Sequence, residues 1–387
     1  MQKPFRRLPV LCLFFFFFSV SVLYAADAVT VIIKPDPPAV SSPKQIELAF
    51  VLDTTGSMAG LIEGAKKKIW SIANTVIDSN PGADIRIGLV GYRDLGDDYV
   101  TRSFPLTPDV QTLYAHLLAF EAKGGGDTPE SVNEALDVAV TKLGWSSPGT
   151  GRTSRILFLV GDAPPHMDYQ QDRKYPEVIR DAVQRGIIVN TVQAGDMTQT
   201  RTVWREMARL GQGEYMAIPQ DGGRVVVIET PYDVEIRTIQ NNLNLTLIPY
   251  GTRARQEAAA KQARMYEEAR PSTAADMSSY VSKAKQGRAV ITGAGDLVAD
   301  VEKGEARLSD IPVAELPENL QKMSEKEREA YLATQKTRRA ELSKTLAEKI
   351  QQRDAWLRTQ AAETPKDKDA GDSFDRSVSK TLLKQIQ

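Results

Sequence analysis

Oxygen-bearing side chains gather in three short stretches of this sequence. The set comprises Asp53, Thr55, Ser57, Thr128 and Asp162. Carboxylate and hydroxyl oxygens suit hard cations such as Mg²⁺, which commonly binds through one or two carboxylates and keeps several waters. Hydroxyls are weak donors, so an ion held in this way would retain a coordination position that faces solvent. An Asp or Glu side chain from another molecule could fill that position.

The secondary structure expected around these residues would bring them to one place. Residues 46–52 and 156–160 are apolar runs that predict buried strands, and Asp53 and Asp162 come directly after them. Thr128 follows three glycines at the expected start of a helix. Doubly wound sheets bind their ligands outside the carboxyl ends of the strands. We therefore expect the three stretches to converge at one edge of a sheet.

Short apolar runs alternate with segments of helical spacing between residue 45 and about residue 250. The runs that predict strands are 46–52, 85–90, 156–160, 186–192 and 215–218, with 245–248 as a candidate return to the sheet. The segments that predict helices are 57–77, 109–121, 127–143, 175–185, 202–210 and 232–243. This alternation predicts an α/β fold with a doubly wound, mostly parallel sheet and helices on both of its faces.

The composition changes after Gly251. Residues 251–323 are expected to form a helical and irregular connector, and residues 324–360 one long helix opened by a Ser-x-x-Glu capping box. An apolar stripe on that helix could pair with a helix of a partner chain, as in a coiled coil, or pack within the chain. The stripe consists of Leu342, Leu346 and Ile350. The polar tail at 361–387 is expected to be disordered.

The first residues have the layout of an export signal. Basic residues precede an apolar run at 10–23, and small residues follow, so residues 1–26 are interpreted as a signal peptide and 27–44 as a linker. We expect an exported protein, periplasmic or extracellular, with an uncleaved membrane anchor as the alternative. The single cysteine, Cys12, lies inside the signal. A processed chain would therefore have no disulfide, thiolate metal site or cysteine nucleophile.

Charge and histidine content argue against several other function classes. The 387 residues carry a net charge of −1, which gives no overall basic footprint for nucleic acid. Two histidines are too few for a histidine-rich zinc site and make a Ser-His-Asp triad improbable. His116 lies in an apolar helical segment and is interpreted as a packed or surface residue. His166 follows Asp162 and could orient a partner, although a structural role in a proline turn is the simpler interpretation.

The five oxygen-bearing residues resemble the metal-ion-dependent adhesion site of von Willebrand factor A domains. That pattern is Asp-x-Ser/Thr-x-Ser after the first strand, a distant Thr, and an Asp after a later strand, and all five positions are matched. The resemblance covers about residues 45–240 within a domain placed at 45–250. It implies a non-catalytic binding module whose ion, Mg²⁺ or else Mn²⁺ or Ca²⁺, is completed by an Asp or Glu of a protein partner.

Two further segments resemble one bacterial and protist branch of the same family, which includes exported members. They are Gly-Tyr-Arg-Asp at 91–94 and Asp-Ala-Pro-Pro-His at 162–166. The Arg93–Asp94 pair is expected to brace the site through an ion pair, or to be a solvated turn. The helix from Ser324 resembles a tail of some exported bacterial members.

Taken one at a time, the five residues have plainer interpretations. Ser57 and Thr128 could be helix caps, and Asp53 and Asp162 could be turn residues. The sequence as a whole predicts a metal-dependent protein-binding module of an exported protein. One alternative is an assembly scaffold with a vestigial metal site, joined through the helix at 324–360. Another is a metal-assisted hydrolase in which His166 acts as the general base.

Overall fold

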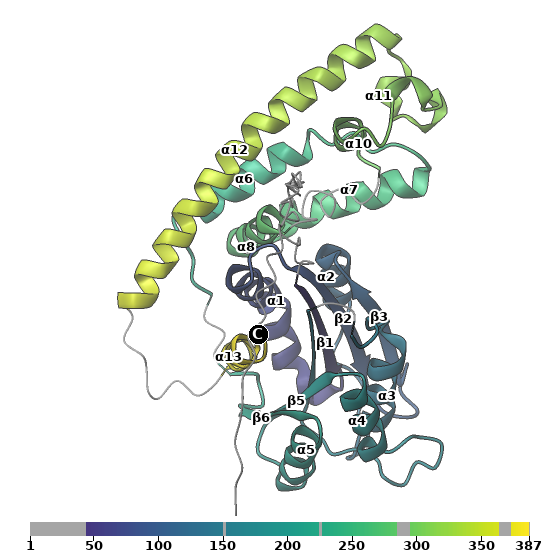
Figure 1. Ribbon diagram of the computed structural model, residues 1–387, viewed down its shortest axis with the longest axis vertical. Helices are drawn as coiled ribbons and strands as arrows, with labels where there is room; N and C mark the ends of the chain where they lie inside the picture. The colour runs from purple at the N-terminus through teal and green to yellow at the C-terminus, as the bar shows by residue number, and fades with distance from the viewer. Residues whose placement is uncertain (1–43, 150–151, 224–226, 285–294, 364–372, 387) are drawn as a thin grey trace, which may run out of the picture. The chain divides into compact units, whose positions relative to one another are not determined.

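The apolar runs of the sequence form the strands of a six-stranded sheet in the computed structural model, which describes residues 44–149, 152–223, 227–284, 295–363 and 373–386 (Figure 1). The strand order is β3-β2-β1-β4-β5-β6, and only the β2–β3 pair is antiparallel. The strands are β1 (Gln45–Asp53), β2 (Asp84–Tyr92), β3 (Thr101–Thr107), β4 (Thr153–Gly161), β5 (Ile187–Ala194) and β6 (Gln212–Ile218). The predicted signal and nearly all of the predicted linker lie outside the described residues.

Helices cover both faces of the sheet, because the strands are apolar on both sides. Leu48 and Phe50 of β1 belong to one core, whereas Ala49 and Val51 belong to the other, as the two-residue period of a strand requires. The first face is covered by α1 (Ala59–Ser79), α2 (Val110–Leu118) and α13 (Phe374–Gln385). Helices α7 (Arg253–Glu268) and α8 (Pro271–Lys283) extend the same core by packing against α2 and α1. The second face is covered by α3 (Val132–Lys142), α4 (Tyr175–Gln184) and α5 (Thr198–Leu210). The predicted doubly wound α/β fold is confirmed.

Strand β3 has no counterpart among the predicted strands. It lies at the edge of the sheet and pairs with β2 alone, so most of its side chains are partly or fully exposed. An edge strand needs no continuous apolar run, and it tolerates a proline such as Pro105. Its sequence therefore lacks the pattern by which buried strands are found.

The helix predicted to begin at residue 127 or 128 begins at Val132 instead. The backbone N–H of Glu130 donates to the carbonyl of Pro164, and the N–H of His166 donates to the carbonyl of Glu130. These two bonds hold residues 127–131 in a loop against the segment that follows β4. The prediction of the helix start was wrong because a tertiary contact outweighs the local helical pattern.

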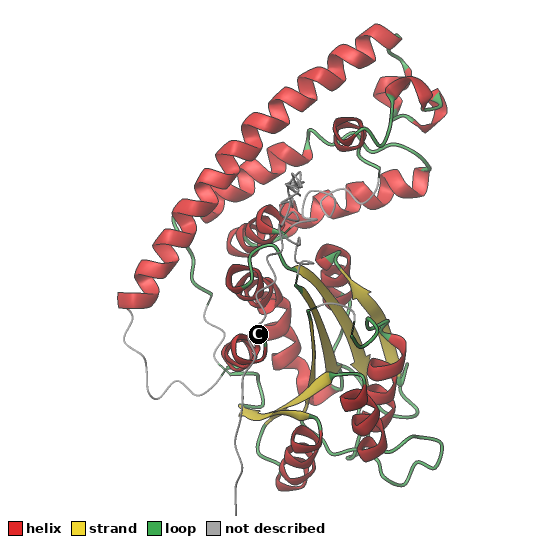
Figure 2. Ribbon diagram, viewed as in Figure 1, coloured by secondary structure: helices red, strands yellow, loops and turns green. Residues whose placement is uncertain are grey.

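The long helix α12 (Glu325–Glu363) begins as predicted (Figure 2). Its capping box is formed, since the backbone N–H of Ser324 donates to the Glu327 carboxylate over 2.7 Å and the N–H of Glu327 donates to the Ser324 hydroxyl over 3.4 Å. The predicted apolar stripe packs within the chain, against α6 (Asp233–Asn244) and α8. Helices α10 (Leu297–Lys303) and α11 (Glu318–Gln321) belong to a further apolar cluster. The stripe is therefore occupied inside this chain.

Two expectations for the C-terminal half are wrong. Residues 245–248 form a turn after α6 instead of returning to the sheet, and the nearby Pro249 makes an isolated bridge to Asp296. The end of the tail is helix α13, whose Phe374, Val378 and Leu382 are buried beside α1. These residues recur every four positions, which is helical spacing. No helix in the described part of the chain is long and apolar enough to span a bilayer.

Candidate metal centre

The strand order brings two of the predicted ligands side by side. Strands β1 and β4 are neighbours at the centre of the sheet, and the connections that leave them run in opposite directions. Asp53 is the last residue of β1, and Asp162 is the first residue after β4. This switch in direction opens a crevice at the carboxyl edge of a doubly wound sheet, which is where such folds bind ligands.

The first loop aligns three oxygen-bearing side chains. Asp53 is fully buried, and its Oδ1 accepts hydrogen bonds from the backbone N–H of Thr55, at 2.8 Å, and from the Thr55 hydroxyl, at 2.7 Å. The Oγ1 of Thr55 lies 3.2 Å from the Oγ of Ser57. The alternating residues of the loop thus place a carboxylate and two hydroxyls in a continuous chain.

The remaining two predicted ligands share a pocket with this loop. Thr55, Ser57, Thr128 and Asp162 all line one pocket of about 380 Å³ at the edge of the sheet. Thr128 is exposed there, and one oxygen of the Asp162 carboxylate accepts a hydrogen bond from Gln220 over 2.6 Å. Asp53 is linked to the pocket through Thr55. The structure therefore brings the five predicted residues together.

Two glycines make this close approach sterically feasible. The carbonyl of Gly124 accepts a hydrogen bond from the N–H of Gly56 over 3.1 Å, and Gly124 has a φ of +78°. A Cβ at Gly124 would stand 2.2 Å from the Oδ1 of Asp97. A Cβ at Gly161 would stand 2.4 Å from the Tyr92 hydroxyl and 3.0 Å from the Cβ of Asp53. A larger residue at either position would displace the loops that carry the site.

The buried carboxylate of Asp53 lacks a compensating charge. Its Oδ2 has no hydrogen-bond partner among the described residues. Burial, as the largest cause, and the negative charge of Asp162 together raise the pKa of Asp53 to about 7, although the hydrogen bonds from Thr55 act in the opposite direction. A buried, unpaired carboxylate is costly in free energy, and a bound cation removes that cost. The donor set therefore fits a divalent ion.

Glu130 is a residue of the same pocket that the sequence analysis missed. It is 4% exposed, and its Oε2 has no hydrogen-bond partner among the described residues. Burial, as the largest cause, and the nearby carboxylates of Asp53 and Asp94 together raise the pKa of Glu130 to about 9. A glutamate just after a proline resembles an ordinary residue of a helix first turn. Glu130 lines the pocket because residues 127–131 form a loop instead of the predicted start of the helix.

Arg93 and Asp94 are buried, so the interpretation as a solvated turn is wrong. The ion pair of Arg93 is with Asp98 instead of the expected Asp94, and Arg93 donates to the carbonyl of Glu121 over 2.8 Å. It also donates to the carbonyl of Thr54, which lies within the ligand loop between Asp53 and Thr55. Arg93 therefore ties the ligand loop to the segment that precedes the three glycines.

A comparison of the sequence with protein families identifies the domain. Residues 47–230 match the family model described as the von Willebrand factor A domain. An ariadne-like RING finger protein of Acanthamoeba polyphaga mimivirus is 30% identical over 125 residues, which are 31% of this chain and 11% of that protein. The alpha-protein kinase vwkA of Dictyostelium discoideum is 27% identical over 130 residues, or 33% of this chain and 20% of the kinase.

Solved structures give two further neighbours. An aerotolerance-related membrane protein from Bacteroides fragilis has a TM-score of 0.31 and 15% identity, covering 46% of this chain and 92% of that one. The SpRpn10 VWA domain has a TM-score of 0.34 and 13% identity, covering 46% and 88%. Both TM-scores are below 0.5, and the assignment does not depend on them. As the resemblance predicted, residues 47–230 of this chain belong to the von Willebrand factor A domain family.

Proposed function

We propose that this domain binds a protein partner through a divalent cation held at the edge of its sheet. Domains of this family are generally interaction modules. The observation that carries the proposal is the Oδ2 of Asp53, an oxygen of a fully buried carboxylate that has no partner among the described residues and lies next to aligned hydroxyls. The ion would be held by Asp53, Thr55, Ser57, Thr128 and Asp162. Oxygen ligands of this kind suit Mg²⁺, with Mn²⁺ or Ca²⁺ as alternatives.

The partner would supply an Asp or Glu carboxylate to the ion. Hydroxyl ligands carry no charge, so the cation stays attractive to a further anion. Thr128 is exposed at the mouth of the pocket, which leaves room for a side chain to enter from solvent. Such a contact is charge-assisted and depends strictly on the metal.

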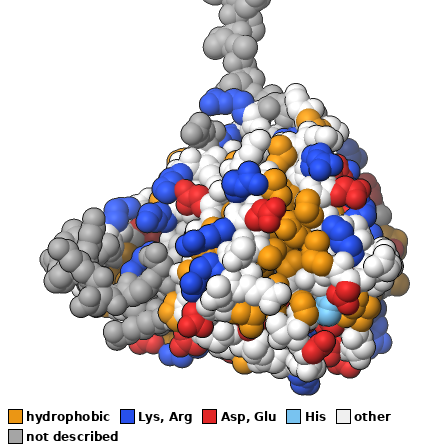
Figure 3. All heavy atoms as spheres, turned by 90° about the horizontal axis from the view of Figure 1, so that it is seen from below, with side chains coloured by type: hydrophobic (Ala, Val, Ile, Leu, Met, Phe, Trp, Pro, Cys, Tyr) orange, Lys and Arg blue, Asp and Glu red, His pale blue; other side chains and the backbone are white. Residues whose placement is uncertain are grey.

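Four features bear on the cellular setting and on the alternatives. The signal-like residues 1–26 support export to the periplasm or the exterior, or membrane attachment if they are retained. Figure 3 shows a face on which basic and acidic side chains are interspersed around hydrophobic ones, in keeping with a protein partner. Assembly through the stripe of α12 is disfavoured because α6 and α8 occupy it. His166 is buried and does not line the pocket, which disfavours the hydrolase.

The test is retention of a partner from an extract of the source organism on immobilised, tag-free protein. We expect a partner that is retained in Mg²⁺, released by EDTA, and absent with Asp53→Ala or Thr128→Ala. Asp310→Asn, an exposed change in the C-terminal region, serves as the matched control and should behave as the wild type. Retention of the same proteins in EDTA and by Asp53→Ala would refute the proposal.

A further inference from the structure

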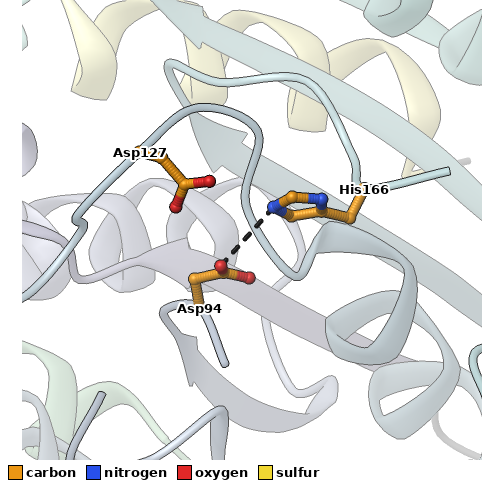
Figure 4. Close-up of side chains that lie close together, drawn as sticks. All are labelled: Asp94, Asp127 and His166. Atoms are coloured by element: carbon orange, nitrogen blue, oxygen red, sulfur yellow. Dashed lines mark ion pairs between the residues drawn. The ribbon is translucent and has the colours of Figure 1, made fainter. Parts of the chain in front are cut away.

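A second group of ligand-type side chains lies beside the five-residue site. Asp94 follows β2, Asp127 belongs to the glycine-rich loop, and His166 lies on the loop after β4 (Figure 4). One ligand atom of each lies within 4.8 Å of the other two. None of the three belongs to the adhesion motif. Three loops far apart in the sequence thus converge on a second point.

The imidazole of His166 is held in the orientation that a metal ligand needs. Its Nδ1 lies 2.8 Å from the Oδ1 of Asp168, and its ring stacks on Tyr169 with the centroids 3.9 Å apart. Its Nε2 is buried and has no hydrogen-bond partner among the described residues. A carboxylate at one ring nitrogen fixes the proton there and leaves the lone pair of the other nitrogen for a metal. The free nitrogen faces Asp94, at 3.5 Å from its Oδ2.

Asp94 is also held in place. It is 4% exposed, its Oδ1 accepts from the Ser131 hydroxyl, and its Oδ2 accepts from the Tyr169 hydroxyl, each over 2.8 Å. Each carboxylate oxygen has two lone pairs, so both bonds leave capacity for a cation. Hydrogen-bonded carboxylates and oriented imidazoles are what surrounds protein metal ligands. Asp127, by contrast, is exposed and free to adjust its side chain.

We propose that Asp94, Asp127 and His166 form a second cation site, which takes a divalent transition metal of the Zn²⁺ class. Zinc binds imidazole nitrogen and carboxylate oxygen at about 2.0–2.2 Å, so ligand atoms around a tetrahedral ion are ~3.4 Å apart. The 3.5 Å between His166 Nε2 and Asp94 Oδ2 already matches that separation. Rotation of the exposed Asp127 side chain supplies the third ligand. A fourth coordination position stays open. The imidazole nitrogen distinguishes the metal preference of this site from that of the five-residue site, whose ligands are all oxygens.

Occupancy of the second site would act on the first. Asp127 lines the pocket of the five-residue site and precedes Thr128 in the chain. A metal bridging Asp127 to Asp94 and His166 would fix the loop that presents Thr128. The inference stands independently of the proposed function, because its ligands and its metal class differ from those of the adhesion site.

The experiment is calorimetric titration of Zn²⁺ into tag-free protein in an excess of Mg²⁺, which keeps the five-residue site filled. We expect one Zn²⁺ per chain, with affinity at least about tenfold lower in Asp127→Asn and in His166→Gln. His116→Gln is the matched control and should bind as the wild type. Asp53→Ala should lose the Mg²⁺-dependent partner and keep the Zn²⁺, which separates failure of this inference from failure of the proposed function.

Nitrogen NMR of the two histidines gives a direct readout of ligation. On adding Zn²⁺, the Nε2 resonance of His166 should move, and those of His116 should stay unchanged. The inference is overturned if Zn²⁺ does not bind in excess Mg²⁺, or if Asp127→Asn binds it as tightly as the wild type. It is also overturned if both nitrogens of His166 stay protonated with Zn²⁺ present, because the ring would then be a cation paired with Asp94 and Asp168. Asp127 is exposed, so its variant remains informative even if His166→Gln fails to fold.

Discussion

Buried carboxylates occur in two regions of this molecule and are treated in opposite ways. Where α12 meets α6 and α8, Arg353 donates to Asp233 and to Asp276, each over 2.7 Å. At the edge of the sheet, Asp53 and Glu130 each keep a buried oxygen that has no partner within the described part of the chain, and the charged neighbours that raise their pKa values are carboxylates. The chain supplies its own cation to the helix junction, whereas under the proposed function the edge of the sheet takes an exchangeable one.

A second arginine repeats the pattern of the junction. Arg339 of α12 forms an ion pair with Asp296, which is 1% exposed and caps α10 by accepting from the N–H of Ala299. Arg339 also donates to the carbonyl of Thr246 over 2.6 Å. Arginine suits such places because its rigid fork of donors satisfies several acceptors at once. Helix α12 is thus fixed to the rest of the C-terminal region by charge as well as by its apolar stripe.

The largest expected effect comes from removing the cation at the junction. Arg353→Met should lower the free energy of unfolding by about 3–5 kcal/mol, because the buried carboxylate of Asp233 and the half-buried one of Asp276 would lose their partner. Arg358→Met, at an exposed position of the same helix, should change it by less than ~0.5 kcal/mol. Urea unfolding measures both. Equal effects of the two variants would remove the distinction between the two regions.

At the edge of the sheet, by contrast, the buried carboxylates are expected to make the stability of the metal-free protein depend on pH. Asp53 has a folded-state pKa near 7, above that of an unfolded aspartate, so the folded state binds the extra proton. Stability should therefore fall as pH rises from about 4 to about 7, by up to ~4 kcal/mol. Glu130, with a pKa of about 9, extends the fall to higher pH.

Saturating Mg²⁺ should remove most of this fall, since the cation compensates the ionised carboxylates. Urea unfolding at about pH 5 and about pH 8, with EDTA and with Mg²⁺, gives the comparison. A metal-free protein that is equally stable at both pH values would show that these carboxylates are compensated within the chain.

Replacing Glu130 by a neutral side chain should remove part of the free-energy cost of these uncompensated carboxylates. Glu130→Gln should stabilise the metal-free protein near pH 8 by ~1–3 kcal/mol, the range for a buried polar group that has lost its charge. Glu329→Gln, at an exposed site on α12, is the control and should have almost no effect. Urea unfolding of the wild type and of both variants in EDTA measures the change in the free energy of unfolding. Destabilisation by Glu130→Gln would mean that the ionised glutamate already has a favourable partner.

The smallest expected effect comes from an exposed helix cap, which provides a reference for the effects of the buried charges. Ser324 caps α12, and Ser324→Ala should cost about 1 kcal/mol. Ser309→Ala, in an exposed turn outside the helix, is its control. A loss from Ser324→Ala as large as that from Arg353→Met would indicate that α12 depends on its cap rather than on its buried ion pairs.

Local pattern was enough to predict most of the fold. The buried strands are apolar runs and α1 to α6 follow helical spacing, because packing on both faces of a sheet demands those patterns. Strand β3 was not predicted because an edge strand does not need a continuous apolar run. The terminal helix α13 was missed because it follows a highly charged segment, although Phe374, Val378 and Leu382 carry a helical period.

The residues of the candidate site likewise fall into two groups, those that the sequence pattern predicts and those that it does not. Asp53 and Asp162 were predictable because each ends a strand, and the topology takes both strand ends to one edge. Glu130 and the Asp94–Asp127–His166 group were not, since their positions depend on the hydrogen bonds that join residues 130 and 164–166. Such contacts between loops leave no periodic signal in a sequence. The ion pairs of Arg353 likewise join residues that the sequence separates widely.

Calorimetric titration of Mg²⁺ into metal-free protein near pH 8 tests the central claim most directly, because Asp53 is then largely ionised. We predict one Mg²⁺ per chain, binding that disappears in Asp53→Asn, and unchanged binding in Asp310→Asn. Absence of binding to the wild type, or equal binding to wild type and Asp53→Asn, would contradict the account.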